Sequence, residues 1–374
     1  MSKSQWHTLK IDFAGNSIRV ALDGKVYIEE EDDHIRGAGV VGVWAKADSV
    51  TAFDDFSPPP VRGAERNSRG KRWRMHSSLK LAALAFAATV ATTTFAADPE
   101  WMKSVGEALG KNGSAMPGGV YRVGLARSDL KVTLDGVEIK PALALGSWLA
   151  FRKMGDQGVV MGDLVLLTNE VTPVMTKLEQ SGIEITALHN HLLRNEPFTM
   201  YMHVLGHGDP VKLATALHTA LAESKTPLDG AAPSQAQAST STDLDTAAID
   251  KALGHKGKVS GGVYQVSIPR AEHIRERGMD VPEVMGSAIG INFQPTGGGK
   301  AAITGDFVLI AKEVNPVVKA LRDHGIEITA LHNHMLNEQP RLFFMHFWAN
   351  DELGKLTAGL KAALDQMNLA KQSG

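Results

Sequence analysis

Six histidines in this sequence fall into two sets of three with the same spacing. In each set two histidines are separated by one residue, and the third follows twelve positions later. The sets are His189, His191 and His203, and His332, His334 and His346. The first two histidines of each set end the same ten letters, GIEITALHNH, at Gly182–His191 and Gly325–His334. Ten identities at an interval of 143 residues indicate two copies of one structural unit.

Three imidazoles with one open position suit a zinc or copper ion that holds a water molecule. A single histidine on a half-buried strand is more often a core or hydrogen-bonding residue. Three on one predicted face, repeated at equal spacing, favour a metal or catalytic site. We therefore predict that each repeat binds a divalent transition metal, zinc or copper, through its three histidines. No nucleotide or flavin cofactor is expected.

The residues around the histidines suggest supporting roles. Glu196 and Glu338 lie in the predicted turn, where a carboxylate could reach a metal-bound water as a general base. The two copies place this group differently, because Glu196 aligns with Gln339, and this weakens the assignment. Asn190 and Asn333 fall on the opposite strand face, where they would support the ligands or the fold.

Two other functions stay open. One is a metal-dependent hydrolase for an envelope or carbohydrate substrate, in which the open coordination position generates hydroxide. The other is a non-catalytic module that binds a glycan or small molecule, with Tyr201, Phe344 and Trp348 stacking on a sugar. For these aromatic residues, packing between the lobes is an equally good interpretation. Met202 and Met345 alternate away from the histidine face, so core packing is favoured over copper ligation.

A strand must carry the first two histidines of each set. Residues 183–191 alternate β-branched and polar side chains, a period-2 pattern that puts both histidines on one face. The run FTMYMHV at Phe198–Val204 is a second strand, and Arg194–Pro197 supplies turn residues between them. A hairpin symmetric about Pro197 would put His191 directly opposite His203, with His189 as a diagonal neighbour.

Each repeat shows strand, helix, strand, strand and helix in order. Thr172-Pro173 and Asn315-Pro316 read as an N-cap followed by proline at the first helical position, and Asp209-Pro210 begins the last helix of the first copy. This order is most of a split β-α-β layout. We predict an α+β fold with two ferredoxin-like lobes, each an antiparallel sheet with helices on one face. The two lobes could pack together.

Composition limits the partners. Apolar residues make up 43% and charged residues 21%, as in ordinary globular proteins, and the formal net charge of −2 offers no basic face for nucleic acid. The absence of cysteine excludes disulfides, thiolate ligands and a lipidated cysteine. No apolar run is long enough to span a bilayer comfortably.

The predicted organisation has six segments. They are a β fragment (1–57), a basic linker (58–74), a signal-like segment (75–96), repeat 1 (97–225), a flexible linker (226–243) and repeat 2 (244–370). The ending GVWAKADSVTAFDDF of the first segment resembles the last strands of a concanavalin-like, laminin-G-type jelly roll, as in the 3-keto-disaccharide hydrolase family. The resemblance covers about a third of such a β-sandwich, and no catalytic residue is carried over.

Residues 75–96 have the features of a secretory signal peptide. A basic region precedes the apolar run Leu81–Val90, and Thr94-Phe95-Ala96 forms a small-residue cleavage site. We expect Met75 to be the start of a secreted or periplasmic soluble protein. The competing interpretation is a genuine fusion in which this segment forms a core helix or a weak anchor. N-terminal sequencing of the mature protein should give Ala97 or Asp98, and recovery of an intact N-terminal segment would contradict the expectation.

Three motifs of the repeats resemble the LppY/LpqO family. They are the paired GGVY at Gly118–Tyr121 and Gly261–Tyr264, the Gly-Asp-Leu/Phe-Val-Leu strand, and GIEITALHNH followed by MYMH or FFMH. The LppY/LpqO family is a family of domains of unknown function named for mycobacterial lipoproteins. The resemblance covers about residues 97–370 and implies an exported protein of unassigned activity. The sequence departs from the lipoprotein pattern because no cysteine follows the apolar run.

Overall fold

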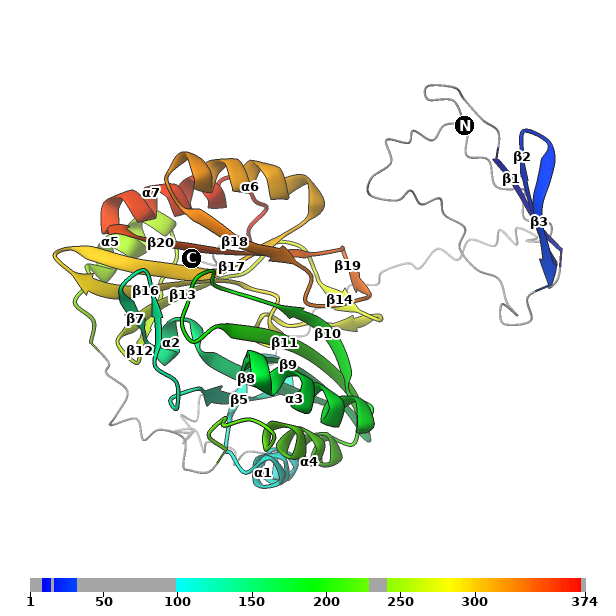
Figure 1. Ribbon diagram of the computed structural model, residues 1–374, viewed down its shortest axis with the longest axis horizontal. Helices are drawn as coiled ribbons and strands as arrows, with labels where there is room; N and C mark the ends of the chain where they lie inside the picture. Colours follow the sequence, from blue (N-terminus) through cyan, green and yellow to red (C-terminus); the bar gives the residue numbers. More distant parts are fainter. Residues whose placement is uncertain (1–8, 15–16, 32–98, 229–240, 371–374) are drawn as a thin grey trace, which may run out of the picture. The chain divides into compact units, whose positions relative to one another are not determined.

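The computed structural model describes residues 9–14, 17–31, 99–228 and 241–370 (Figure 1). The chain forms two compact units, residues 1–89 and 90–374. In the first unit, β1 (Leu9–Ala14), β2 (Ser17–Leu22) and β3 (Lys25–Glu31) form an antiparallel sheet in sequence order. Asp23 and Gly24 join β2 to β3 with positive φ angles of 49° and 81°, as a two-residue hairpin turn requires. The remainder of the predicted β fragment, the basic linker and the signal-like segment lie outside the described residues.

The second unit consists of two lobes of the same architecture. Lobe 1 (residues 99–228) contains α1 (Glu100–Leu109), β4 (Ser114–Met116), the 3-10 helix η1 (Pro117–Gly119), β5 (Val120–Ala126), β6 (Val132–Leu134), β7 (Val137–Ile139), α2 (Pro141–Ala144), β8 (Gly146–Met154), β9 (Gln157–Leu167), α3 (Thr168–Gln180), β10 (Glu184–His189), β11 (Thr199–Gly208) and α4 (Pro210–Leu221).

Lobe 2 (residues 241–370) repeats this plan. It contains α5 (Thr246–Leu253), β12 (Lys258–Ser260), β13 (Val263–Ile268), β14 (Arg275–Glu276), β15 (Met279–Asp280), the 3-10 helix η2 (Glu283–Met285), β16 (Ile289–Gly297), β17 (Lys300–Leu309), α6 (Ala311–Asp323), β18 (Glu327–His332), β19 (Glu338–Gln339), β20 (Phe343–Glu352) and α7 (Leu353–Leu364).

Each lobe is built on a six-stranded antiparallel sheet. The order is β10-β11-β9-β8-β5-β4 in lobe 1 and β18-β20-β17-β16-β13-β12 in lobe 2. The strands β9 and β10, which flank α3 in sequence, are separated in the sheet by β11, so the predicted split β-α-β arrangement is confirmed. The fourth strand of the ferredoxin-like order is β8, which precedes β9 in the chain instead of following the last helix.

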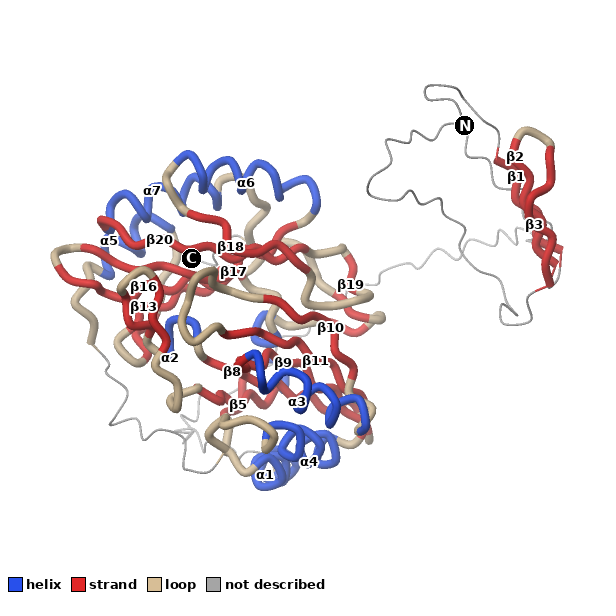
Figure 2. Tube along the Cα trace, in the orientation of Figure 1, coloured by secondary structure: helices blue, strands red, loops and turns tan. Residues whose placement is uncertain are grey.

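The two sheets lie between two outer layers of helices. Figures 1 and 2 show α1, α3 and α4 outside the sheet of lobe 1, and α5, α6 and α7 outside the sheet of lobe 2. In each lobe the helical stripes pack on the outer sheet face. In α7, for example, Leu356, Leu360 and Leu364 are buried. The inner faces of the two sheets therefore meet, and the edge strands β10 and β18 carry the histidine motif to this boundary.

The α3 and α6 helices begin five residues earlier than predicted. Thr172-Pro173 and Asn315-Pro316 are not caps, because Pro173 and Pro316 lie inside helices that begin at Thr168 and Ala311. The α4 start is confirmed. The Asp209 carboxylate accepts hydrogen bonds from the backbone N–H groups of Val211 and Lys212 at 3.0 and 2.9 Å.

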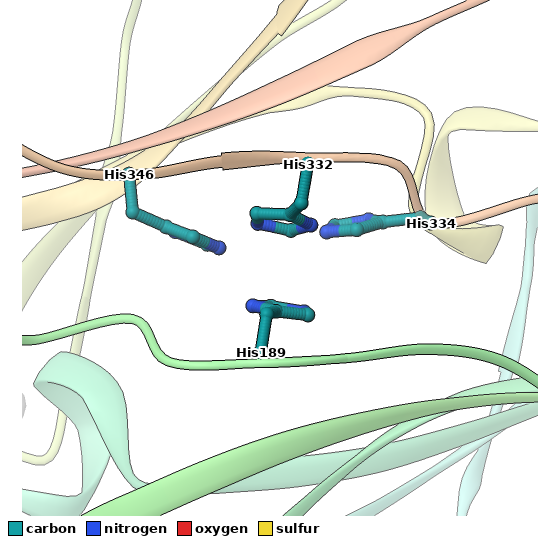
Figure 3. Close-up of side chains that lie close together, drawn as sticks. All are labelled: His189, His332, His334 and His346. Carbon is teal, nitrogen blue, oxygen red and sulfur yellow. The ribbon is translucent and has the colours of Figure 1, made fainter.

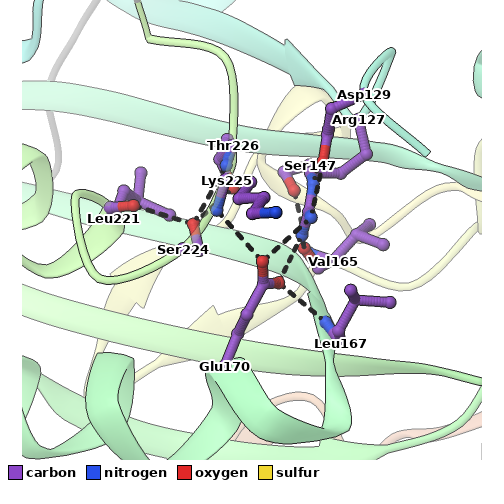
Figure 4. A network of polar contacts seen from close by, with 10 residues as sticks. All are labelled: Arg127, Asp129, Ser147, Val165, Leu167, Glu170, Leu221, Ser224, Lys225 and Thr226. Atoms are coloured by element: carbon purple, nitrogen blue, oxygen red, sulfur yellow. Dashed lines mark hydrogen bonds and ion pairs between the residues drawn. The ribbon is translucent and has the colours of Figure 1, made fainter.

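Glu170 explains the early start of α3. Its carboxylate accepts hydrogen bonds from the backbone N–H of Leu167 at 2.8 Å and of Lys225 at 3.0 Å (Figure 4). Both of its oxygens also bind the fully buried guanidinium of Arg127, at 2.7 and 3.1 Å. Burial alone would raise the pKa of Glu170, but these donors lower it below its ordinary value. A carboxylate in the first turn thereby satisfies N–H groups that a helix start leaves free.

The same network recurs in lobe 2. The Glu313 carboxylate accepts from Ile310 N and Asn368 N, both at 3.0 Å, and binds Arg270 at 2.7 and 3.1 Å. Each of the two arginines also donates to a backbone carbonyl of the central strand, Val165 at 2.8 Å or Val308 at 2.6 Å. The network therefore fixes the central strand, the helix that follows it and the end of the lobe to one another.

The two lobes share a core. One cluster of buried apolar residues contains Val165, Leu192 and Tyr201 of lobe 1 together with Ala302 and Trp348 of lobe 2. Of the predicted flexible linker 226–243, residues 229–240 lie outside the described residues, and Leu228 packs on the lobe 1 core.

Charged pairs cross the lobe boundary beside this core. Arg194 donates to Glu327 at 2.8 and 3.0 Å, and Arg277 donates to Glu184 at 2.6 and 2.9 Å. Glu184 and Glu327 occupy equivalent repeat positions. The expectation that the repeats could pack together is thus met by shared apolar and polar contacts. None of the helices among the described residues is long and apolar enough to cross a membrane.

Candidate metal centre

The strands β10 and β11, and β18 and β20, position the histidines. The predicted register is wrong: His203 pairs with Ala187, and His189 pairs with Tyr201. The strand β10 ends at His189, so His191 lies in the connection that leads to β11. The alternation is interrupted by an irregularity between Ile185 and Ala187, which a period-2 reading does not anticipate. The equivalent irregularity in lobe 2 lies between Ile328 and Ala330.

The structure brings all six histidines into one cluster at the lobe boundary. Figure 3 shows four of them, with His189 of lobe 1 facing His332, His334 and His346 of lobe 2. Each ring of lobe 1 faces a ring of lobe 2. The ring centroids are 3.5 Å apart for His189 and His332, 3.6 Å for His191 and His346, and 3.6 Å for His203 and His334. The sequence predicts a separate site in each repeat. In the structure the two sets of histidines are contiguous: the imidazoles of lobe 1 form one layer, and those of lobe 2 form the next.

Ligand geometry is present within each layer. The ligand atoms of His189, His191 and His203 lie within 4.8 Å of one another, and so do those of His332, His334, His346 and His189. His189 therefore belongs to both groups. Among the described residues, these groups contain histidines only.

The Nε2 atoms of all six histidines are buried and have no hydrogen-bond partner among the described residues. In three of these histidines the other ring nitrogen, Nδ1, lies within hydrogen-bond distance of a backbone carbonyl oxygen. The Nδ1 atoms of His189, His332 and His346 lie 3.2, 3.1 and 2.9 Å from the carbonyl oxygens of Asn190, Asn333 and Gly305. A carbonyl at Nδ1 selects the tautomer with the proton there and leaves Nε2 with a free lone pair. This is the form of imidazole that binds a metal.

Burial keeps most of these rings neutral. Burial and the neighbouring imidazoles lower the pKa of His203 to about 3 and that of His332 to about 4. The same causes lower the pKa values of His189, His191 and His334 well below the ordinary value. These five rings are therefore neutral nitrogen donors at physiological pH.

Two aspartates that the sequence reading missed adjoin the cluster. Asp163 of β9 pairs with His203, and Asp306 of β17 pairs with His346. Asp163 oxygens lie 3.7 Å from His191 Nε2 and 3.9 Å from His203 Nε2, and Asp306 Oδ1 lies 2.9 Å from His346 Nδ1. The sequence contains a signal for these aspartates, because a Gly-Asp pair interrupts the equivalent apolar strand in both repeats.

The two carboxyl groups are in different electrostatic states. Burial and the charge of Asp306 raise the pKa of Asp163 well above its ordinary value, although Arg122 opposes this. Burial would also raise the pKa of Asp306, but His346 lowers it below its ordinary value. The Asp163 Oδ1 atom is buried without a hydrogen bond, whereas Asp306 Oδ1 lies 2.9 Å from His346 Nδ1 and the Asp306 side chain as a whole is 28% exposed. A cation nearby would favour the ionised form of both carboxyl groups.

Reciprocal hydrogen bonds lock the histidine segments across the boundary. Thr186 Oγ1 donates to the His334 carbonyl at 2.6 Å, and Thr329 Oγ1 donates to the His191 carbonyl. Asn333 Nδ2 donates to the Thr186 carbonyl at 3.0 Å, as Asn190 Nδ2 does to Thr329. Asn190 and Asn333 thus support the fold, as predicted. These paired contacts relate the two lobes by a pseudo-two-fold axis.

The two glutamates lie in different surroundings from each other. Glu196 is exposed, and its backbone pairs with Thr133 at 2.8 and 2.9 Å. Glu338 is 3% exposed, and its carboxylate accepts from Leu342 N at 2.9 Å and Arg341 Nη1 at 3.2 Å. Burial raises the pKa of Glu338. Neither belongs to the ligand groups, so a general-base role for either stays a prediction.

The aromatic residues are part of the core. Tyr201 stacks on His191 at 3.4 Å and Phe344 on His334 at 3.5 Å between ring centroids. Tyr201, Phe344 and Trp348 are 1%, 0% and 3% exposed, which leaves no face for a sugar. Met202 and Met345 are also fully buried in the lobe cores, in agreement with the predicted alternation.

The sequence matches the family described as Domain of Unknown Function (DUF1259), over residues 103–223 and again over residues 247–366. The chain belongs to this family. Its two DUF1259 copies coincide with the two lobes, and the expected tandem pair of domains of unknown function is confirmed. The LppY/LpqO and laminin-G-type resemblances stay predictions. A comparison with curated protein sequences gives no match.

Two solved structures show a weak likeness to this DUF1259 protein. One is a trimeric bacterial microcompartment shell protein, PduB, with 10% identity over 69% of this chain and 96% of that chain, at a TM-score of 0.19. The other is EtuB from Clostridium kluyveri, with 10% identity over 68% of this chain and 90% of that chain, at a TM-score of 0.16. At these TM-scores neither bears on the function of the DUF1259 pair.

Proposed function

We propose that this protein binds a divalent transition metal, zinc or copper, at a histidine centre formed jointly by its two lobes. The observation that supports this is the set of six buried Nε2 atoms without hydrogen-bond partners, on histidines whose ligand atoms form two groups within 4.8 Å. We propose further that the protein is exported, on the basis of the signal-like segment at residues 75–96.

The energetics favour an ion at this position. A buried polar group without a partner costs about 1–3 kcal/mol, so six would cost on the order of 6–18 kcal/mol. That is comparable to the net stability of a typical domain, about 5–15 kcal/mol. Structural zinc sites return roughly 10–16 kcal/mol of binding free energy in small peptides. A metal held by these nitrogens would offset the cost. The lowered pKa values of His189, His191, His203, His332 and His334 mean that protons do not compete for those five near neutral pH.

The small size of the enclosed space argues against the larger substrates considered above. A cavity of about 10 Å³ lies beside His203 and His334, and Trp148 and Met285 help to line it. This is about the space that one water molecule occupies. A sugar ring or a peptide would not enter it without separation of the lobes, so metal binding is a better-supported function than hydrolysis of an envelope polymer.

Metal analysis of protein purified without a histidine tag tests the proposal. We expect zinc or copper to be retained, or to bind on titration of metal-free protein. Saturation at 100 times the Kd should stabilise the fold by about 2.7 kcal/mol, which raises Tm by roughly 5–10 °C. Metal-free protein whose Tm is the same with a chelator and with added zinc or copper would overturn the proposal.

A further inference from the structure

The histidine centre has two complete sets of ligands. The lobe 1 layer offers three histidine nitrogens, and the lobe 2 layer offers three more. His189 of lobe 1 belongs to both ligand groups. The three cross-lobe ring pairs are separated by 3.5–3.6 Å between centroids. Three protein ligands with a remaining open position make a complete transition-metal site. One ion would therefore use only half of the donors that the cluster provides.

We propose that the centre is dinuclear, with one ion in each histidine layer and a water-sized bridging ligand between them. This inference depends on the proposed metal-binding function. Ions placed in adjacent layers would be separated by about the layer spacing, close to the roughly 3.5–4 Å found in two-metal sites. The pseudo-two-fold axis makes the two positions equivalent, so a site that suits one ion suits the second.

Asp163 and Asp306 provide the charge that a second ion requires. Two divalent ions this close repel each other strongly in a buried site, and neutral imidazoles do not offset that repulsion. One carboxylate lies beside each layer: Asp163 oxygens are 3.7 Å and 3.9 Å from His191 and His203, and Asp306 is 2.9 Å from His346. Asp163 Oδ1 is buried without a hydrogen bond. Together with a bridging hydroxide the two carboxylates would reduce the charge of the pair from +4 to +1.

The enclosed space defines the class of bridging ligand. The cavity of about 10 Å³ adjoins one of the three cross-lobe ring pairs, His203 and His334, and would admit a ligand the size of water or hydroxide to the centre. Trp148 and Gly286 close the cavity on one side, because a Cβ at Gly286 would lie 2.9 Å from the Trp148 ring. The substrate class implied is a small inorganic molecule or anion bound between two metals, not an organic polymer.

Copper(II) is a suitable probe, because it binds nitrogen sites most strongly among the divalent ions of its row and carries one unpaired electron. We expect two copper ions per chain by metal analysis. The paramagnetic resonance signal should integrate to far fewer than two isolated spins, because neighbouring ions couple magnetically. One copper per chain, or two with the full intensity of isolated spins, would overturn the dinuclear proposal and leave metal binding intact. No copper binding would overturn both.

The aspartates are tested by isosteric variants. Asp163→Asn and Asp306→Asn should each lower the affinity for the second copper by at least tenfold and leave the first within about threefold. Asp323→Asn, a change at an exposed residue paired with Lys319, is the matched control and should alter neither. Unchanged affinity for both ions in Asp163→Asn and in Asp306→Asn would overturn the role given to the carboxylates. Because the spin measurement uses the wild-type chain, it stays decisive even if a variant fails to fold.

Discussion

Replacing His191 and His334 together with alanine should remove high-affinity transition-metal binding. The two residues are equivalent in the repeats, and each belongs to a different ligand layer. Each ring also lies against a histidine of the other lobe, His346 or His203, at 3.6 Å between centroids. Both layers thus lose a nitrogen donor at once. Loss of an outer-shell partner alone costs about 10–100-fold in metal affinity, so loss of two direct ligands should exceed that range.

The measurement is a titration of metal-free protein with zinc or copper, followed by calorimetry and by metal analysis after gel filtration. The matched control is His273→Ala combined with His324→Ala, since both residues are exposed and lie outside the cluster. The control should bind metal as the wild type does. Equal affinity in the cluster variant and the wild type would show that these nitrogens do not hold the ion. The rise in Tm on metal addition should disappear in the cluster variant alone.

Arg127→Met should destabilise the protein by about 3–5 kcal/mol, the usual cost of breaking a buried ion pair by removal of one partner. Arg127 is fully buried and makes two hydrogen bonds to Glu170, two to Asp129 and one to the Val165 carbonyl. Methionine keeps much of the apolar stem but leaves the 6%-exposed Glu170 without its cation. The start of α3 and the central strand then lose a common anchor.

Urea unfolding measured by circular dichroism checks this prediction. Arg270→Met removes the equivalent contacts in lobe 2 and should cost a similar amount. Lys319→Met is the control: its pair with Asp323 lies on the surface, with side chains 75% and 55% exposed, and should contribute about 0–1 kcal/mol. If Arg127→Met and Lys319→Met change the free energy of unfolding by the same amount, the network does not anchor α3.

Much of the architecture could be predicted because it rests on local patterns. The helical stripe of α7, the Asp209-Pro210 cap and the split β-α-β order follow from side-chain periodicity and from residues that satisfy free N–H groups. The start of α3 could not be predicted in the same way. Its cap is a carboxylate, Glu170, whose position depends on Arg127, a partner distant in sequence.

The candidate site was predicted only in part for a related reason. Spacing marked the six histidines, since a repeat preserves the interval between strands. Register did not follow from spacing, because the irregularity after Ile185 shifts the pairing of His203 to Ala187. The meeting of the two sets depends on packing between lobes, in which Thr186 and Thr329 bond to the opposite histidine segments. No local pattern within one repeat contains that information.

The stacked pair His189 and His332 lies where the pseudo-two-fold axis passes between the lobes, since the two residues are repeat equivalents and face each other at 3.5 Å. One copy of the fold alone would offer only half of this arrangement, whereas two separate identical copies related by a two-fold axis would rebuild all of it. Tandem fusion turns that homodimer into an intramolecular assembly, which forms at any protein concentration. It also frees the halves to diverge, as Tyr201 and its counterpart Phe344 have already done.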